Sequence, residues 1–253
     1  MGKICLHCGI LFLPGGNVLI STRQKHLCWH EFFTPIEKAI VYFIDRYDAA
    51  RQLARRLEQY KHQDGVILAV PRGGVPIGYY LAIYLGLSLD LLMTKKIGHP
   101  ENKEYAIGAV GLEDSFIERT HDGIPPGYIQ HETARIRQEL EDRYKRFMGD
   151  RKPLDIQDKT VIVVDDGIAT GRTILATLRM LKSRQPGKLI VAAPVASQQA
   201  AHRIRMEVDD LICLHTPAPF YGVGRFYQDF NQVDDNEVIR LLSYFVAPSP
   251  TTS

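Results

Sequence analysis

The sequence has few cysteines, little net charge and no long hydrophobic run. Four cysteines in 253 residues do not suggest a disulfide framework, and they fit a reducing compartment. The 31 basic residues nearly balance the 29 acidic ones, so a net charge of +2 favours neither a nucleic-acid nor a membrane partner. No apolar stretch approaches the ~20 residues that a membrane-spanning helix needs. We therefore expect a soluble, cytoplasmic protein.

The amino terminus also lacks the pattern of a secretory signal. It carries little positive charge, and its apolar region is interrupted at residues 14–16. Up to about residue 40 the sequence shows no sustained helix or strand period, whereas the later sequence does. We predict an accessory or poorly ordered extension at residues 1–40, a domain at residues 41–246 and a disordered tail at residues 247–253.

The extension contains a candidate zinc site. Cys5 and Cys8 have the spacing of a zinc-ligand pair, and Cys28 with His30 could complete four ligands. The second pair, however, does not have the usual spacing. The alternatives are an extension without metal and a translation start assigned upstream of the real one.

Strand and helix patterns alternate along the rest of the chain. The expected strands are residues 65–70, 89–94, 106–110, 116–117, 161–164, 188–194 and 210–214. The expected helices are residues 49–60, 75–86, 128–148, 174–181, 197–206 and 234–245. This order predicts an α/β fold with a doubly wound, mainly parallel sheet, whose ligands bind at the carboxyl ends of the strands.

The most informative segment is residues 161–173. Four aliphatic residues, typical of a strand buried on both faces, lead into the carboxylates of Asp165 and Asp166. A loop of small and hydroxyl residues follows, and then a helical pattern begins. The loop N–H groups and the helix start suit a phosphate, and the carboxylates suit sugar hydroxyls, directly or through a metal. The segment predicts a site for a phosphorylated sugar; the alternative is a turn that merely ends the strand.

A second loop follows the strand predicted at residues 65–70. It consists of Pro71, Arg72, Gly73 and Gly74. Glycine leaves backbone amides open to an anion, and the Arg72 fork suits diphosphate oxygens. An ordinary tight turn with a solvated arginine explains the loop equally well. Because both loops follow strands, we expect them at one edge of the sheet and in one site.

The segment at residues 161–173 resembles the motif with which type I phosphoribosyltransferases bind 5-phosphoribosyl 1-diphosphate (PRPP). From about Phe43 to Leu242, order and spacing are similar to a bacterial group of phosphoribosyltransferases of undefined base specificity. The resemblance implies a sheet of the type I kind, with a small hood built from the C-terminal segment. It also implies PRPP-dependent transfer of 5-phosphoribosyl to a nitrogenous base, preferably purine-like, with Mg²⁺ and release of pyrophosphate.

The resemblance assigns roles to individual residues. Asp165 and Asp166 would orient the ribose and hold Mg²⁺, directly or indirectly. The 5′-phosphate would bind Ala169, Thr170, Gly171, Arg172 and Thr173. The pyrophosphate group would bind Pro71, Arg72, Gly73 and Gly74. Lys95 and Lys96, in a polar loop at residues 95–105, would stabilise the leaving group, although a solvated loop explains them as well. The base would meet a hood of Phe220, Tyr221, Phe226, Tyr227 and Asp229, for which core packing is the alternative.

Some residues depart from better-known relatives. Ala169 stands where enzymes acting on 6-oxopurines carry a carboxylate, which disfavours hypoxanthine and guanine. Adenine-type enzymes have alanine there, but their loop glutamate has only a loose counterpart in Glu104. Gly167 replaces the usual aliphatic residue, which we expect to loosen the turn. The identity of the base stays open.

Three classes of function remain. The set of loops favours a PRPP-dependent glycosyltransferase. The alternative is a PRPP- or nucleotide-binding regulatory protein with little or no turnover. A nucleic-acid module is the third class, and no basic stripe supports it. Members of the family are commonly oligomeric, and the sequence leaves a homo-oligomer open.

Overall fold

The computed structural model describes residues 42–103, 105–117 and 123–245, and the backbone of three short strands near the amino terminus. These strands, β1 (Lys3–Ile4), β2 (Leu11–Phe12) and β3 (Val18–Leu19), form an antiparallel sheet. They belong to a compact unit at Met1–Ile40, and a second unit spans Val41–Ser253. The candidate zinc ligands Cys5, Cys8, Cys28 and His30, the loose candidate Glu104 and the tail at residues 247–253 lie outside the described residues.

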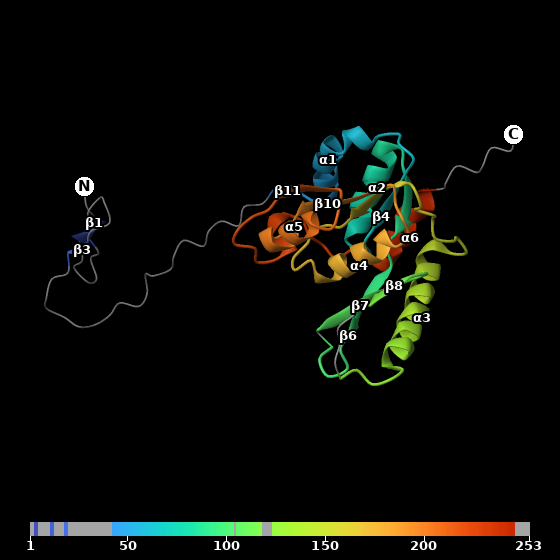
Figure 1. Ribbon diagram of the computed structural model, residues 1–253. Coiled ribbons are helices and arrows are strands. Elements are labelled where there is room, and N and C mark those ends of the chain that lie inside the picture. Colours follow the sequence, from blue (N-terminus) through green and yellow to red (C-terminus); the bar gives the residue numbers. More distant parts are fainter. Residues whose placement is uncertain are drawn as a thin grey trace. The chain divides into compact units, whose positions relative to one another are not determined.

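A five-stranded parallel sheet forms the centre of the second unit (Figure 1). Its strands lie in the order β11 (Asp210–His215), β10 (Lys188–Val195), β9 (Thr160–Val164), β4 (Gly65–Ala69) and β5 (Ser88–Leu91). The three central strands are almost entirely buried, because helices cover both faces of the sheet. The predicted α/β fold with a mainly parallel sheet is confirmed.

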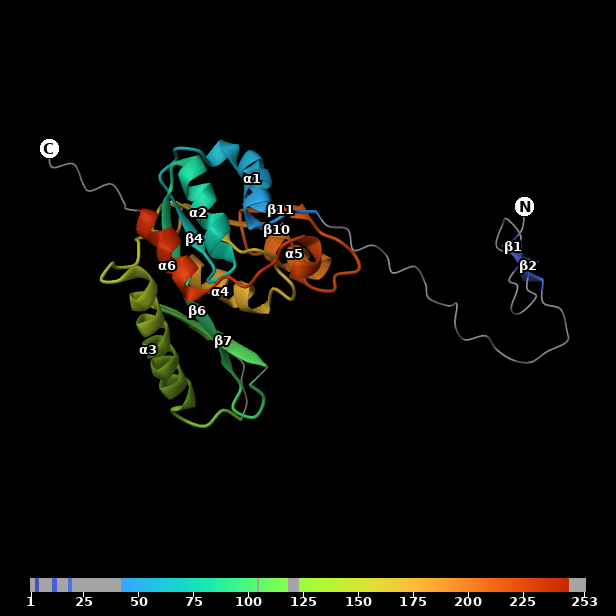
Figure 2. The same cartoon turned by 180° about the vertical axis from the view of Figure 1, so that it is seen from behind.

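Helices pack on both faces of this sheet (Figures 1 and 2). Ile67, Ile162 and Ile190 lie on the face covered by α1 (Arg46–Arg56), α2 (Gly74–Leu85) and α6 (Asp235–Tyr244). Val66, Val161 and Val191 lie on the face covered by α4 (Arg172–Lys182) and α5 (Gln198–Arg205). Neighbouring strand residues point to opposite faces, so β4, β9 and β10 each contribute to both hydrophobic clusters. In the described part of the chain, no helix has the length and apolar character to cross a membrane.

A second, antiparallel sheet and a long helix extend away from the parallel sheet (Figure 2). The sheet has the order β6 (Thr94–Gly98), β7 (Ala106–Gly111) and β8 (Ser115–Ile117), and α3 (Tyr128–Met148) packs against β6 and β7. We call these four elements the arm. The prediction of a loop at residues 95–105 is wrong for residues 95–98, which belong to β6. These residues form β6 because they pair with β7 and place Ile97 in the core.

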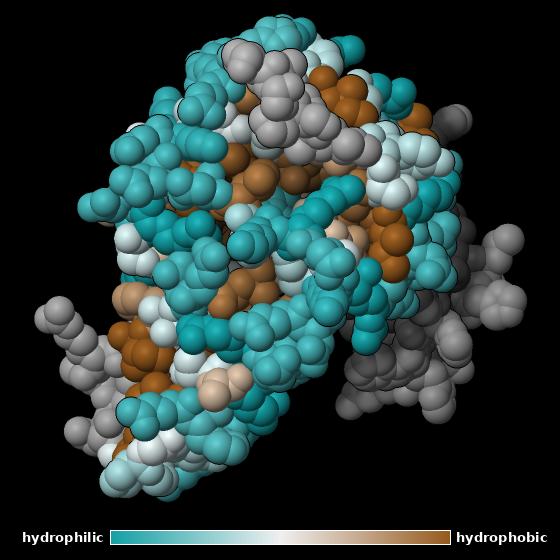
Figure 3. All heavy atoms as spheres, turned by 90° about the vertical axis from the view of Figure 1, so that its right-hand side faces the viewer, coloured by the Kyte–Doolittle hydropathy of each residue, from teal (hydrophilic) through white to brown (hydrophobic). Residues whose placement is uncertain are grey.

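Large apolar side chains are exposed at scattered positions. They are Ile44, Ile83, Tyr105, Met206, Tyr221, Ile239 and Tyr244. They come from several helices and loops, and the face seen in Figure 3 is mostly hydrophilic, with separate apolar areas. Scattered exposed apolar residues are normal for a protein surface. They do not identify an oligomer interface, which the sequence had left open.

Candidate active site

The loops after β4 and β9 lie side by side at the carboxyl edge of the parallel sheet. The two strands are neighbours, with Ala69 paired to Val164. Beyond this pair, the Val70 N–H donates to the Val164 carbonyl at 2.8 Å. Both loops therefore leave the sheet at the same level, which confirms that the two sequence motifs meet in one place.

The first loop rests directly against the acidic pair. A Cβ atom built on Gly73 would lie 2.0 Å from Oδ2 of Asp166, and one on Gly74 would lie 2.5 Å from the Val164 carbonyl oxygen. Neither position has room for a side chain. The peptide bond between Pro71 and Arg72 is cis. The glycines are thus required for the close approach of this loop to β9 and Asp166, and anion binding by the loop stays a prediction.

Asp166 is held by an arginine that precedes it by 120 residues. Its Oδ2 accepts a hydrogen bond from Arg46 Nε at 2.9 Å and lies 2.8 Å from Arg46 Nη2. Only 11% of the Arg46 side chain and 14% of the Asp166 side chain are exposed. Arg46 also donates from Nη1 to the Asn231 carbonyl at 2.8 Å, and its guanidinium carbon lies 4.0 Å from the ring centre of Phe230. One side chain therefore joins the start of α1, the acidic pair and the C-terminal segment.

Burial raises the pKa of both carboxyl groups of the acidic pair. For Asp165 the pKa lies well above its ordinary value, because the group is desolvated and the charge of Asp166 adds to the effect. Burial also raises the pKa of Asp166, but the Arg46 guanidinium opposes that shift. The two carboxyl groups therefore differ in their surroundings. Asp166 forms an ion pair with Arg46, whereas Asp165 accepts a hydrogen bond from the Asp166 N–H at 2.9 Å.

The loop after the acidic pair forms an open turn before α4. Gly171 has a φ of 69°, and α4 starts at the next residue with no side chain in the described part capping it. Ala169, Thr170, Arg172 and Thr173 are exposed. The Ser197 hydroxyl donates to the Ala169 carbonyl and anchors the turn to the start of α5. The first N–H groups of α4 lack partners within the helix, so the turn has the geometry of an anion site.

Gly167 allows close packing, and the expected loosening of the turn stays a prediction. A Cβ atom on Gly167 would lie 2.4 Å from Cγ1 of Val223 and 3.1 Å from Cγ1 of Val195. A larger residue would push the segment around Val223 away from the sheet.

Arg72, on the first loop, lies against the start of α6. Its Nη1 lies 3.2 Å from Oδ1 of Asp235, and Arg146 of α3 reaches the other oxygen of Asp235 at 3.5 Å. The side chains of Arg72 and Asp235 are each 32% exposed. To reach a diphosphate, Arg72 has to share or leave Asp235.

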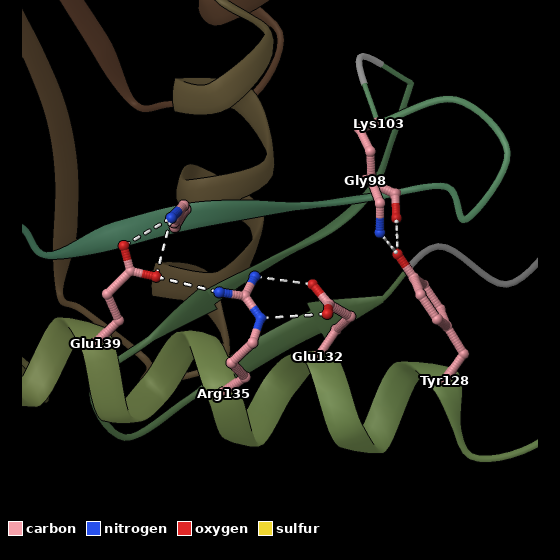
Figure 4. A network of polar contacts seen from close by, with 7 residues as sticks. Gly98, Lys103, Tyr128, Glu132, Arg135 and Glu139 are labelled. Atoms are coloured by element: carbon pink, nitrogen blue, oxygen red, sulfur yellow. Dashed lines mark hydrogen bonds and ion pairs between the residues drawn. The ribbon is translucent and has the colours of Figure 1, made fainter.

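Lys95 and Lys96, predicted to stabilise the leaving group, lie on β6 in the arm. Lys95 Nζ lies 2.8 and 3.0 Å from the two carboxylate oxygens of Glu139 on α3, and Glu139 also contacts Arg135 (Figure 4). Lys96 is the next residue of the strand and is half-buried. The structure engages Lys95 within the arm and not at the acidic pair. A role for the two lysines at the diphosphate stays a prediction.

The five predicted hood residues fall into two groups. Phe226 and Tyr227 are buried, Tyr227 packs against Phe43, and its hydroxyl donates to the Asp166 carbonyl at 2.7 Å. Tyr221 is 79% exposed, Asp229 is exposed, and Phe220 lies 5.3 Å from Phe226 between ring centres. Core packing therefore describes Phe226 and Tyr227. Contact with a base stays a prediction for the other three.

Sequence reasoning missed Arg46, Phe230, Asn231 and Asp235. Arg46 precedes the helix expected at residues 49–60, and only the structure places it in the first turn of α1, where a basic side chain opposes the helix dipole. Such a placement indicates a partner outside the helix. No local pattern names that partner, because Asp166 is 120 residues away.

Asp165 and Asp166 fit a magnesium ion that arrives with a diphosphate. Among the described residues, no group of three or more His, Cys, Asp or Glu side chains could hold a metal alone. Mg²⁺ commonly binds through one or two carboxylates together with substrate phosphates. The donor set therefore suits a shared ion and not a separate protein metal centre.

Known proteins resemble this chain over most of the second unit. The phosphoribosyl transferase domain family matches residues 44–226. "Putative phosphoribosyl transferase Rv0571c" of Mycobacterium tuberculosis is 36% identical over 207 residues, which cover 79% of this chain and 46% of that protein. This chain thus spans about half the length of the curated relative. The crystal structure of TT1426 from Thermus thermophilus has a TM-score of 0.75 and 33% identity, covering 82% of this chain and 100% of that one. The ribose-phosphate pyrophosphokinase of Pyrococcus furiosus is 28% identical over 185 residues, 63% of this chain and 64% of that protein.

Proposed function

This chain belongs to the phosphoribosyl transferase domain family, and on that basis we propose that it moves 5-phosphoribosyl from PRPP to a nitrogenous base and releases pyrophosphate. The observation that carries the proposal is the direct contact between the glycine loop at residues 71–74 and the acidic pair. An open turn at the start of α4 follows directly. Two anion-binding loops with a carboxylate pair between them match the three parts of PRPP: diphosphate, ribose and 5′-phosphate.

Each part of the substrate has its own group of residues in this proposal. The 5′-phosphate binds the exposed turn at residues 169–173, the ribose hydroxyls bind Asp165 and Asp166, and the diphosphate binds residues 71–74. The two carboxylates would also hold Mg²⁺, directly or through water, and a bound ion would supply positive charge for the diphosphate. Binding energy from the remote 5′-phosphate positions the reacting carbon.

The reaction is a substitution at the anomeric carbon of the ribose. The bond from this carbon to the diphosphate oxygen breaks, and its electron pair leaves with the pyrophosphate. A ring nitrogen of the base forms the new bond with its lone pair, and the base releases one proton to water. Positive charge develops on the sugar next to the acidic pair, and negative charge develops on the diphosphate next to Arg72. Preorganised charges of opposite sign stabilise both changes.

A purine-like base agrees with the resemblance to type I phosphoribosyltransferases, and Ala169 limits which purines can be the acceptor. Ala169 has no proton-transferring group, so a base that needs a carboxylate there is disfavoured. Of the four aromatic residues predicted for the hood, Phe220 and Tyr221 keep exposed surface, and we propose that they contact the base.

The second candidate is a PRPP- or nucleotide-binding regulator with little or no turnover. Two contacts favour it. Lys95 is paired with Glu139 and Arg72 with Asp235, so both of these cations, proposed for the leaving group, are engaged within the protein. The two candidates share the binding site and differ in whether these cations reach the diphosphate.

Calorimetric titration with PRPP and Mg²⁺, followed by a screen of nucleobases for pyrophosphate release, tests both. Binding with release for one base establishes the transferase and names its acceptor. Binding without release for any base favours the regulator. Asp165→Asn should abolish binding or release, whereas Asp155→Asn, at an exposed residue, should change neither. A wild-type protein that does not bind PRPP would contradict both candidates.

A further inference from the structure

Arg46 connects three segments of the proposed site. It begins α1, its fork binds Asp166, and its remaining contacts go to Phe230 and Asn231. We infer that Arg46 is a positioning residue: it sets the orientation of the Asp166 carboxylate toward the sugar and ties that carboxylate to the C-terminal segment. The inference rests on the proposed function, because it concerns the sugar that Asp166 would bind.

Both contacts between the Arg46 guanidinium and Asp166 go to one oxygen of the carboxylate. Nε lies 2.9 Å and Nη2 lies 2.8 Å from the same atom, Oδ2. The guanidinium plane is fixed on its other sides by the Asn231 carbonyl at Nη1 and by the ring of Phe230. A planar guanidinium can make these contacts together, whereas a lysine ammonium has no plane to stack and no fork.

The glycine loop also lies against this carboxylate. A Cβ atom on Gly73 would overlap Asp166, at 2.0 Å from Oδ2 and 2.5 Å from Cγ. The carboxylate is therefore confined by the Arg46 fork and by the backbone of Gly73. If the fork is removed, one of these two constraints is lost, and Asp166 is free to take another rotamer.

The link to the C-terminal segment is reinforced by the backbone. The Phe43 N–H donates to the Phe226 carbonyl, the Gln228 N–H to the Phe43 carbonyl and the Asp229 N–H to the Ile44 carbonyl, at 2.8–3.1 Å. The start of α1 and residues 226–231 thus form one hydrogen-bonded unit. Arg46 therefore fixes the position of the Asp166 carboxylate relative to this hydrogen-bonded unit.

Two other roles for Arg46 make different predictions. If Arg46 binds a phosphate itself, its loss adds to the loss of Asp166. If the ion pair only stabilises the fold, its loss affects all ligands alike. A positioning residue that acts through Asp166 instead affects the sugar, and has little further effect once Asp166 is neutralised.

A double-mutant cycle measured by calorimetry separates these cases. Arg46→Gln, Asp166→Asn and the double variant are titrated with PRPP and Mg²⁺, with ribose 5-phosphate and with inorganic pyrophosphate. Arg51→Gln is the matched control, because Arg51 lies on the same helix with 56% of its side chain exposed and pairs with Asp48. If Arg46→Gln does not fold, Arg46→Lys takes its place, since it keeps the charge and loses the fork.

We expect Arg46→Gln to weaken binding of PRPP and ribose 5-phosphate about tenfold or more, equivalent to ~1.4 kcal/mol. Pyrophosphate binding should change by less than about twofold, and the double variant should match Asp166→Asn within about threefold. Unchanged ribose 5-phosphate binding in Arg46→Gln, multiplied losses in the double variant, or an equal loss for all three ligands would each overturn the inference. A wild-type protein that binds none of these ligands would overturn the proposed function and this inference with it.

Discussion

Two nitrogens of Arg46 lie within 2.9 Å of one carboxylate oxygen of Asp166, and both side chains are largely withdrawn from solvent. Breaking such a pair by removing one partner leaves the other charge buried and uncompensated. The ion pair between Arg46 and Asp166 is therefore expected to contribute to the stability of the fold as well as to ligand binding.

Replacing Arg46 by alanine should strongly destabilise the fold. We expect Arg46→Ala to lower the free energy of unfolding by about 3–5 kcal/mol at neutral pH, because the Arg46 cation then no longer offsets the burial of the Asp166 carboxyl group. Urea denaturation followed by circular dichroism measures this change. Arg51→Ala should cost no more than about 0.5 kcal/mol, because its pair with Asp48 is exposed. Equal effects of the two substitutions would contradict the structure.

The stability of the protein should fall as the pH rises through the pKa of Asp165. This pKa is raised in the folded protein by burial and by the charge of Asp166. A raised pKa means that the folded state binds the proton more tightly than the unfolded state. The stabilisation is thus complete below the ordinary pKa of an aspartate, and it is lost as the pH climbs through the folded value.

Urea denaturation between pH 4 and pH 8 measures this dependence. Asp165→Asn cannot ionise and should show a flatter pH profile than the wild type, whatever its absolute stability. Asp155→Asn, at an exposed residue, should keep the wild-type profile. Parallel profiles for wild type and Asp165→Asn would show that the carboxyl does not titrate as the structure indicates.

Adding a methyl group at Gly73 should displace Asp166. The new Cβ would lie 2.0 Å from Oδ2, so the carboxylate or the loop has to move. We expect Gly73→Ala to weaken PRPP binding at least about tenfold, equivalent to ~1.4 kcal/mol. Gly149→Ala is the comparison: its Cβ meets nothing within 4 Å, so PRPP binding should persist even though the φ of 65° is unfavourable for alanine. Full binding by Gly73→Ala would argue against the contact between the loop and the acidic pair.

Neutralising Asp235 should release Arg72 for the diphosphate. Asp235 pairs with Arg72 at 3.2 Å and places a negative charge beside the proposed pyrophosphate site. We expect Asp235→Asn to tighten binding of inorganic pyrophosphate by about threefold or more, with a smaller gain at high salt, because this partly exposed pair is partly screened. Glu237→Gln, in the same first turn of α6, is the control for the helix dipole. Weaker binding by Asp235→Asn would show that Asp235 holds Arg72 in its working position.

Much of the fold follows from local patterns. The buried aliphatic runs at β4, β9 and β10 and the apolar spacing of α3 are properties of short segments, so the expected elements largely match the observed ones. β6 is the exception. Beyond Thr94, which ended the strand expected at residues 89–94, its only local strand signal is Ile97, and residues 95–98 form a strand because β7 lies beside them. Pairing of that kind is a tertiary effect that overrides local preference.

The sequence by itself determined the parallel sheet, the two loops and the residue types in them, because strand burial, glycine and paired carboxylates leave signals within a dozen residues. Only the tertiary structure decided that Arg46 binds Asp166, that Arg72 faces Asp235 and that Lys95 is held by Glu139. Each of these pairs joins residues that are far apart in the chain. Their meeting depends on the order of the strands and on which helices pack beside them, and no local pattern encodes that order.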